Sequence, residues 1–201
     1  MSPISRGFRG RRAPDVNPER VPPGQYVTPD FPVLSAGPTP HTPLEEWSFT
    51  IRGAVDTPVS WTWTDFQALP SQSVTVDIHC VTKWSKLDTG WTGVSLDTLL
   101  AGVETSAEYA LAFSDGGYTT NLPLEDLVGG KAWVAYEYDS EPLDPEHGGP
   151  ARLLVPHLYF WKSAKWVRGL ELRAEDEPGF WEGYGYHNYG DPWKEQRYWG
   201  D

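Results

Sequence analysis

Short alternations of apolar and polar residues fill most of the chain after Trp47 and predict a series of β-strands. Each alternation is bounded by Gly, Pro or Asp, which favour turns. The periodicity predicts strands at 47–52, 73–79, 109–113, 118–122, 132–138, 152–155 and 167–173.

Only two short segments have the signals of helices. The first spans 64–69 and is stopped by Pro70, and the second spans 96–101, where Ser95 can cap the start and Gly102 can terminate the end. Nothing repeats along the chain at intervals of 20 to 50 residues, which argues against a solenoid or propeller. The pattern therefore predicts a β-rich α+β fold.

The segments that flank these elements have no regular period. Residues 1–45 carry ten prolines, and we expect 1–20 to be a basic, disordered tail and 21–45 an extended arm. The glycine- and aromatic-rich stretch 178–201 should form an ordered coil. The length of 201 residues suits one domain, which we place at 21–201 with the arm packed on it.

The net charge and the absence of long apolar runs argue against nucleic acid and membrane as partners. A net charge of -12 repels phosphate backbones, so nucleic acid is not an expected partner. No run approaches the eighteen apolar residues that a membrane span needs, and we expect no membrane insertion. Arg11 and Arg12 suggest a twin-arginine export signal, but no apolar core follows them, so the sequence predicts a cytoplasmic protein.

The single cysteine, Cys80, excludes an internal disulfide, a zinc site of several thiolates and a self-contained iron–sulfur cluster. It ends a predicted buried strand, and Lys83 and Lys86 follow it as cations that would favour a thiolate. The thiol could be an inert part of the core, since free cysteines are often buried. It could also be a nucleophile paired with a distant histidine, because the neighbouring His79 points to the opposite face of a strand.

A third interpretation makes Cys80 a ligand of a soft metal whose other thiolates come from a cofactor. Four sequence blocks, in a fixed order, favour it. They are FPVLSAGPTP at 31–40, HCVTKWS at 79–85 with WTGVSL at 91–96, SDGGYTTNLPL at 114–124, and EHGGPARLLVP at 146–156 with WKSAKWV at 161–167. Together they resemble the sulfite-oxidase superfamily over about residues 20 to 200, and more closely its branch near the bacterial protein-methionine-sulfoxide reductase catalytic subunit and its cytoplasmic relatives.

The resemblance implies a single molybdopterin-binding domain with mixed sheets and short helices. It implies an oxidoreductase that uses Mo-molybdopterin for two-electron, oxygen-atom-transfer-type chemistry on a small-molecule substrate, with Cys80 as catalytic residue and metal ligand. An external electron carrier would be needed, because no haem or flavin motif is present. The cofactor-binding residues it implies are Val33, Leu34, Ser35, His79, Cys80, Asp115, His147, Arg152, Ser163, Ala164 and Lys165.

Elementary chemistry agrees with part of this set. Arg152 offers a planar fork of donors and Lys165 a point charge, and both suit a buried phosphate. His147 precedes two glycines, where the backbone can approach a flat ligand closely. Asp115 could equally be a turn residue before Gly-Gly. A non-catalytic molybdopterin carrier or binding module remains the alternative function.

The chain departs from the family where sulfite oxidases place arginines, because Leu34, Trp84 and Ser85 hold those positions. An oxyanion needs fixed positive charge, so sulfite is disfavoured as a substrate unless a nearby lysine substitutes. The candidate substitutes are Lys83, Lys86 and Lys162. We hypothesise that an aromatic entrance prefers a neutral or flat substrate and is lined by Trp84, Tyr159, Trp161 and Tyr186.

Overall fold

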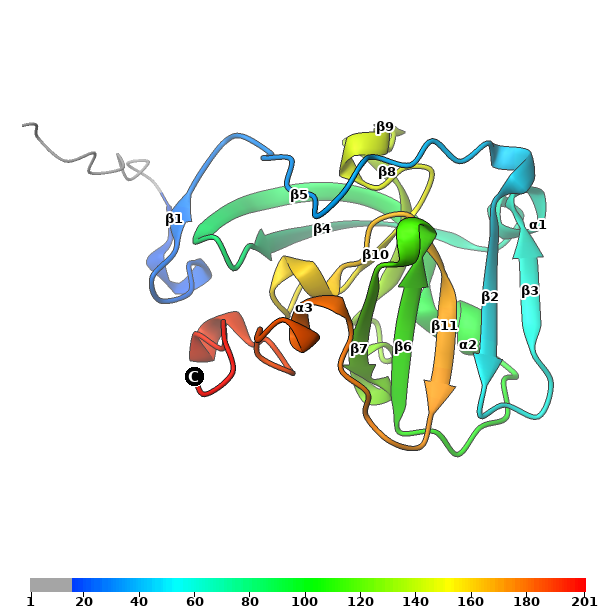
Figure 1. Ribbon diagram of the computed structural model, residues 1–201. Coiled ribbons are helices and arrows are strands. Elements are labelled where there is room, and N and C mark those ends of the chain that lie inside the picture. Colours follow the sequence, from blue (N-terminus) through cyan, green and yellow to red (C-terminus); the bar gives the residue numbers. More distant parts are fainter. Residues whose placement is uncertain (1–15) are drawn as a thin grey trace, which may run out of the picture.

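The computed structural model describes residues 16–201, folded around two β-sheets (Figure 1). The arginines of the possible export signal and most of the expected 1–20 tail lie outside the described residues. The first sheet has the strand order β1-β5-β8-β10, with β4 paired to β5 and β9 to β8. Its strands are β1 (Tyr26–Val27), β4 (Ser71–His79), β5 (Trp84–Ser95), β8 (Trp133–Tyr138), β9 (Glu141–Pro142) and β10 (Arg152–Leu154).

The second sheet has the order β3-β2-β11-β6-β7. Its strands are β2 (Ser48–Gly53), β3 (Val59–Thr62), β6 (Tyr109–Ser114), β7 (Thr119–Pro123) and β11 (Val167–Arg173). Both sheets are mixed, because β1 runs parallel to β5 and β11 runs parallel to β2, while the other pairs are antiparallel.

Three short α-helices complete the fold: α1 (Trp63–Gln67), α2 (Leu96–Leu100) and α3 (Phe180–Gly183). The Ser95 side chain accepts a hydrogen bond from the backbone N–H of Thr98 and caps α2. Thr62 caps α1 in the same way. The predicted β-rich class with mixed sheets and short helices is therefore confirmed. Within residues 16–201, no helix is long and apolar enough to cross a membrane.

The long strand β5 is not predicted by the alternation of apolar and polar residues. Asp88 has a positive φ of 55°, and the pairing with β8 shifts register between Thr92 and Gly93. Gly93 lies so close to β8 that a Cβ would stand 2.4 Å from the carbonyl oxygen of Val134. A bulged, glycine-containing strand lacks the period of 2 that signals a strand in sequence.

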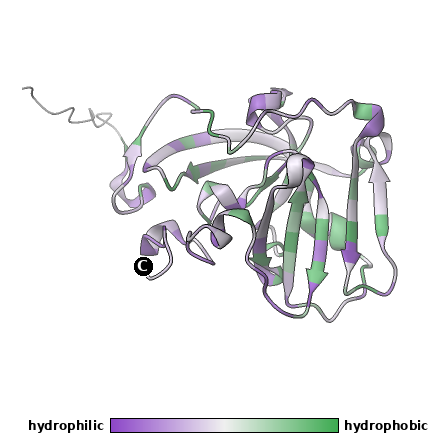
Figure 2. Cartoon of the chain, viewed as in Figure 1, coloured by the Kyte–Doolittle hydropathy of each residue, from purple (hydrophilic) through white to green (hydrophobic). Residues whose placement is uncertain are grey.

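Two apolar clusters form the interior. The larger one includes Trp47, Phe49 and Leu170 and packs the second sheet, whose apolar residues Figure 2 shows along β6, β7 and β11. The smaller cluster is rich in aromatic rings and includes Cys80 and Trp161. The thiol therefore belongs to an aromatic core that is built on the first sheet.

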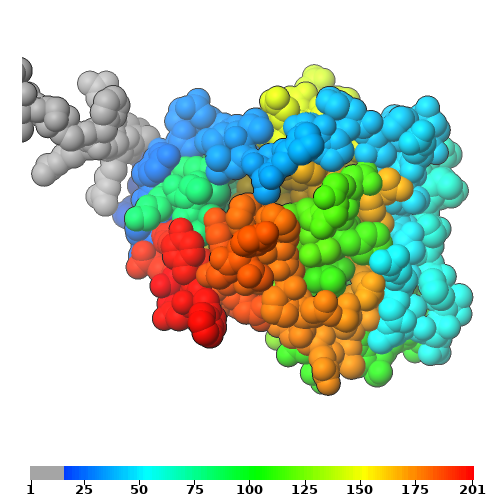
Figure 3. All heavy atoms as spheres, in the orientation of Figure 1, coloured from blue at the N-terminus to red at the C-terminus, as the bar shows by residue number. Residues whose placement is uncertain are grey.

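Arg20, the arm and the C-terminal segment 178–201, called the tail from here on, are held to the rest of the domain by specific contacts. The arm crosses the surface of the domain in Figure 3. Arg20 makes ion pairs of 2.6 Å with both Asp77 and Asp88. Thr42 donates to Asp115 at 2.6 Å. At the other end, α3 is anchored by Glu182, which accepts hydrogen bonds from Thr120 and Trp161.

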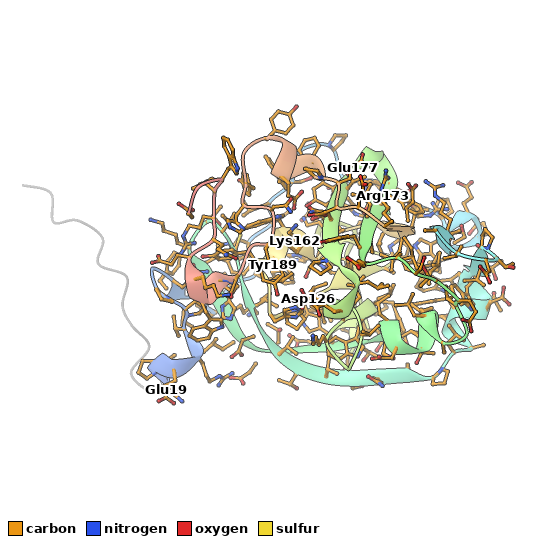
Figure 4. All side chains as sticks on the ribbon, turned by 90° about the horizontal axis from the view of Figure 1, so that it is seen from below. Glu19, Asp126, Lys162, Arg173, Glu177 and Tyr189 are labelled. Carbon is orange, nitrogen blue, oxygen red and sulfur yellow. The ribbon has the colours of Figure 1, made fainter. Side chains whose placement is uncertain are left out.

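Glu182 also forms a buried ion pair, and its loss should destabilise the fold. Its Oε1 lies 2.7 Å from Nζ of Lys162, which Figure 4 labels, and both side chains are 1% exposed. Glu182→Gln leaves the ammonium buried without its counter-charge, which should lower the free energy of unfolding by about 3 kcal/mol. Urea denaturation measures this. The matched control is Glu177→Gln, whose 53% exposed carboxylate pairs with Arg173 and contributes about 0–1 kcal/mol; equal effects of the two variants would contradict the prediction.

Candidate functional site

A cavity of about 660 Å³ opens between the arm, the β4–β5 turn, the 114–118 turn, the 147–166 segment and the tail. It brings together most of the residues that the sequence singles out, from four of these five segments. Those that line it are Leu34, Ser35, Cys80, Asp115, His147, Arg152, Ser163, Ala164 and Lys165. Val33 and His79 do not belong to its lining.

Cys80 occupies the tight turn that joins β4 to β5. Its backbone N–H donates to the carbonyl of Trp84 at 2.8 Å, and the turn closes through Lys83, which has a φ of 77°. The thiol is nearly buried, and the Thr82 hydroxyl donates to Sγ at 3.2 Å. Burial raises the pKa of the Cys80 thiol, and the Thr82 hydrogen bond and the charge of Arg197 oppose this.

Lys83 and Lys86 were expected to favour a Cys80 thiolate, but the structure does not place them in the cavity. Lys86 donates to the carbonyl of Pro29 in the arm, and neither Lys83 nor Lys86 lines the cavity. Positive charge acts on the thiol instead from Arg197, which lies 117 positions further along the chain, and from Lys165.

His79 points away from the cavity, as expected for the neighbour of Cys80 on a strand. Its Nδ1 lies 2.8 Å from the Ser85 hydroxyl, and its ring meets Trp193 edge-on. Burial lowers the pKa of His79 to about 4, so the ring is neutral at pH 7. Its side chain holds the ends of β4 and β5 together.

Arg152 is a buried cation at the floor of the cavity. Its side chain is 1% exposed, and its guanidinium donates to the carbonyls of His147 at 2.8 Å and Ser163 at 2.6 Å. The guanidinium also stacks over Phe160 at 4.0 Å. No carboxylate in residues 16–201 forms an ion pair with it. Burial lowers the pKa of Arg152 to about 9.

Lys165 repeats this arrangement. Its ammonium donates to the carbonyls of Leu34 at 2.8 Å and Glu146 at 2.7 Å, and it too has no carboxylate partner in the part of the chain that is described. Burial and the charge of Arg152 lower the pKa of Lys165 to about 8. Two uncompensated cations lining one cavity form a site for an anion, because a phosphate would offset the repulsion between them.

His147 contributes a neutral ring with a free nitrogen. The ring stacks on Phe31 with centroids 3.9 Å apart and an interplanar angle of 14°. Burial, then the charges of Arg152 and Lys165, lower the pKa of His147. Its Nδ1 is buried and has no hydrogen-bond partner among the described residues. Because buried polar atoms are rarely left unpaired, this nitrogen fits a hydrogen bond to the edge of a flat heterocycle such as a pterin.

Asp115 lines the cavity, but its carboxylate bonds to other residues of the protein. Oδ1 lies 3.1 Å from Nη1 of Arg168, and Oδ2 accepts the hydrogen bond from Thr42 in the arm. Gly116 and Gly117 follow it in the lining, each with a positive φ. The turn thus anchors the arm and exposes backbone to the cavity.

Ser163 and Ala164 offer backbone rather than side chains. The Ser163 hydroxyl accepts from the N–H of Val155 at 2.9 Å, and the Ala164 carbonyl accepts from Leu153 at 2.8 Å. These bonds fix the segment that carries Lys165 against β10.

Much of the remaining wall is aromatic. Trp84, Trp161 and Tyr186 line the cavity as hypothesised, whereas Tyr159 lies outside the lining and stacks on Trp161 at 5.4 Å. Sequence reasoning missed six further rings, which only the fold brings here: Phe31, Tyr118, Phe160, Trp166, Phe180 and Trp181. None of the lysines considered as replacements for the missing arginines lines the cavity.

Within residues 16–201, no group of three or more His, Cys, Asp or Glu side chains is arranged to hold a metal ion. Cys80 would therefore act as a lone protein ligand, and other ligands would have to come with a cofactor. One thiol, two cations without a carboxylate partner and one unpaired imidazole nitrogen within these residues fit a molybdopterin with its phosphate.

Comparisons with known proteins also point to a molybdopterin-binding domain. The family model described as "Oxidoreductase molybdopterin binding domain" matches residues 36–181. The chain is 47% identical to the uncharacterised oxidoreductase YuiH of Bacillus subtilis, covering 89% of this chain and 92% of that protein. It is 27% identical to the sulfite oxidase of Arabidopsis thaliana over 77% of this chain, and spans half of that protein. The sulfane dehydrogenase SoxCD of Paracoccus pantotrophus shares the fold, with a TM-score of 0.62 at 23% identity, over 69% of this chain and 41% of that one.

Proposed function

Because the chain belongs to the oxidoreductase molybdopterin-binding domain family and is a molybdopterin-dependent oxidoreductase, we propose that Cys80 is its only protein ligand to molybdenum. We further propose that it carries out two-electron, oxygen-atom-transfer-type chemistry on a small substrate. The observation that carries this proposal is one cavity lined by the Cys80 thiol and by two cations, Arg152 and Lys165, that have no carboxylate partner within residues 16–201. That combination suits a phosphate-bearing, metal-binding cofactor.

The three charged or polar residues Arg152, Lys165 and His147 bind the cofactor in this proposal. Arg152 and Lys165 bind the phosphate of the pterin, and Nδ1 of His147 binds its ring edge. When bound, the cofactor supplies the two-electron redox change and the oxygen-atom transfer. The chain binds and orients that group, and its aromatic wall excludes water from it.

The other expected residues support these contacts. Val33, Leu34 and Ser35 contribute arm backbone, as the Lys165 bond to the Leu34 carbonyl already does within the chain. His79 keeps the Cys80 turn closed through Ser85. Ser163 and Ala164 position Lys165, and Asp115 fastens the arm. Electrons are exchanged with an external carrier, because the sequence has no haem or flavin motif.

The contacts of the arm also bear on the extent of the domain. We propose that the folded unit spans 21–201 with 21–45 as its arm, since Thr42 and the Tyr26–Val27 strand both pair with the body. The family model begins only at residue 36, so this unit is larger than the matched region.

The test is a measurement of molybdenum and released pterin in protein made by a host that synthesises the cofactor. We expect stoichiometric amounts of both, and reduction of the bound metal by an artificial electron donor. A non-catalytic carrier would hold the cofactor but would not turn over with any electron donor. A thiol nucleophile would be active without metal and blocked by alkylation, and well-folded protein free of molybdenum would contradict the proposal.

The substrate preference should be for neutral molecules. Both cavity cations are assigned to the phosphate, and the family's arginine positions hold Leu34, Trp84 and Ser85. We expect kcat/KM for neutral sulfoxides or N-oxides to exceed that for sulfite by about 100-fold, since charged hydrogen bonds contribute about 1.5–3 kcal/mol. Steady-state assays measure both. Trp84→Arg should raise the rate with sulfite, whereas an efficient wild-type reaction with sulfite would end this interpretation.

A further inference from the structure

The turn that carries Cys80 is held by residues from the two ends of the described chain, and both lie outside the matched region 36–181. Arg197 of the tail is 7% exposed. Its guanidinium donates to the Val81 carbonyl at 3.2 Å and to the Pro23 carbonyl at 3.2 Å, and it stacks over the Tyr159 ring at 5.0 Å. One side chain therefore connects the cysteine turn, the arm and the aromatic core.

The arm closes the same turn from its other side. The Gln25 side chain donates to the Cys80 carbonyl at 3.0 Å, and the Tyr26 N–H donates to the Lys83 carbonyl at 2.9 Å. The arm and Arg197 are also in close contact, because a Cβ on Gly24 would stand 3.1 Å from Nη2 of Arg197. Consecutive carbonyls of the turn are thus bound by two different segments.

The charge of Arg197 is only weakly compensated. Its nearest carboxylate in the described chain is Glu195, at 3.6 Å, and that side chain is 52% exposed to water. Water screens such an exposed partner, while the buried guanidinium keeps its field on the turn. The positive charge of Arg197 therefore stays at the Val81 carbonyl, which belongs to the residue directly after Cys80.

We propose that Arg197 is a positioning residue for Cys80: it fixes the Val81 carbonyl so that the turn stays closed, and it keeps a positive charge on the turn that carries the Cys80 sulfur. The second part rests on the proposed function, in which that sulfur binds molybdenum. The first part does not, because it concerns only the closure of the turn. Gln25 shares the closing role and lacks the charge, so the two parts can be measured separately.

Turn closure is tested in protein made without cofactor. A maleimide that carries a polyethylene glycol chain is too large for the cavity and should label Cys80 only when the turn opens. We expect Arg197→Gln and Gln25→Ala to increase the labelling rate about tenfold, the scale of one lost hydrogen bond, and Arg197→Lys to increase it less. The control is Arg52→Gln on β2, a surface arginine paired with Glu171, which should label like the wild type.

The charge is tested in the molybdenum-loaded enzyme. Loss of a nearby cation stabilises the more oxidised metal, so Arg197→Gln should make the midpoint potential more negative, while Gln25→Ala and Arg197→Lys should leave it near the wild-type value.

Wild-type labelling rates in Arg197→Gln and Gln25→Ala would overturn the closing role. An unchanged potential in metal-loaded Arg197→Gln would overturn the charge role. If Arg197→Gln does not fold, Arg197→Lys and Gln25→Ala decide the closing role by labelling alone. Wild-type protein without molybdenum would instead contradict the proposed function and leave the labelling result standing.

Discussion

Replacement of Cys80 by serine should leave a folded protein whose turnover has fallen by more than about 100-fold. Loss of a residue that only orients a metal ligand costs about 10–100-fold, and loss of the ligand itself should exceed this. A serine hydroxyl stays protonated at neutral pH and is a hard oxygen donor, whereas a thiolate donates strongly to soft metals. The measurements are turnover, molybdenum content and the thiolate-to-metal absorption band, with circular dichroism to verify the fold.

The matched control for this variant is Thr82→Val. It removes the only side-chain hydrogen bond to Sγ among the described residues and leaves the sulfur in place. We expect it to keep its molybdenum and its absorption band. A Cys80→Ser enzyme with wild-type turnover and an unchanged spectrum would show that the sulfur is not a ligand.

The fold could be predicted from the sequence where one face of a strand is buried. The alternation in 109–113 and 167–173 matches β6 and β11, because each packs one face on the larger core. The strand β5 was not predicted, because its bulges and its glycines interrupt the alternation of apolar and polar residues. Close approach of Gly93 to β8 is a tertiary requirement that a local pattern does not reveal.

The candidate site could be predicted only as far as its residues lie in recognisable blocks. His147, Arg152 and Lys165 belong to one such block, and they line the cavity with Cys80. Arg197 belongs to none, and it reaches the cysteine turn only because the tail folds back onto β4 and β5. The same limit applies to the aromatic wall, since rings from the arm, the core and the tail meet there only in three dimensions.

Arg152→Met should weaken cofactor binding but leave the stability of the cofactor-free protein nearly unchanged. Binding should weaken by about two orders of magnitude, because the phosphate loses a buried, planar donor. The cofactor-free fold should change little: removing an uncompensated buried cation is favourable, and this offsets the hydrogen bonds lost by the His147 and Ser163 carbonyls. Pterin content after extended dialysis measures the first effect, and the melting temperature of cofactor-free protein measures the second.

Two further variants separate charge from geometry at this position. Arg152→Lys keeps the charge but replaces the planar fork with a point charge, so it should retain more cofactor than Arg152→Met and less than the wild type. Arg52→Met is the control for losing an arginine at the surface and should retain the cofactor fully. If Arg152→Met bound the cofactor as tightly as the wild type, Lys165 alone would have to hold the phosphate. No bound anion would then account for the buried charge of Arg152. Within the described chain, its N–H groups donate only to backbone carbonyls, and its guanidinium stacks on the apolar ring of Phe160.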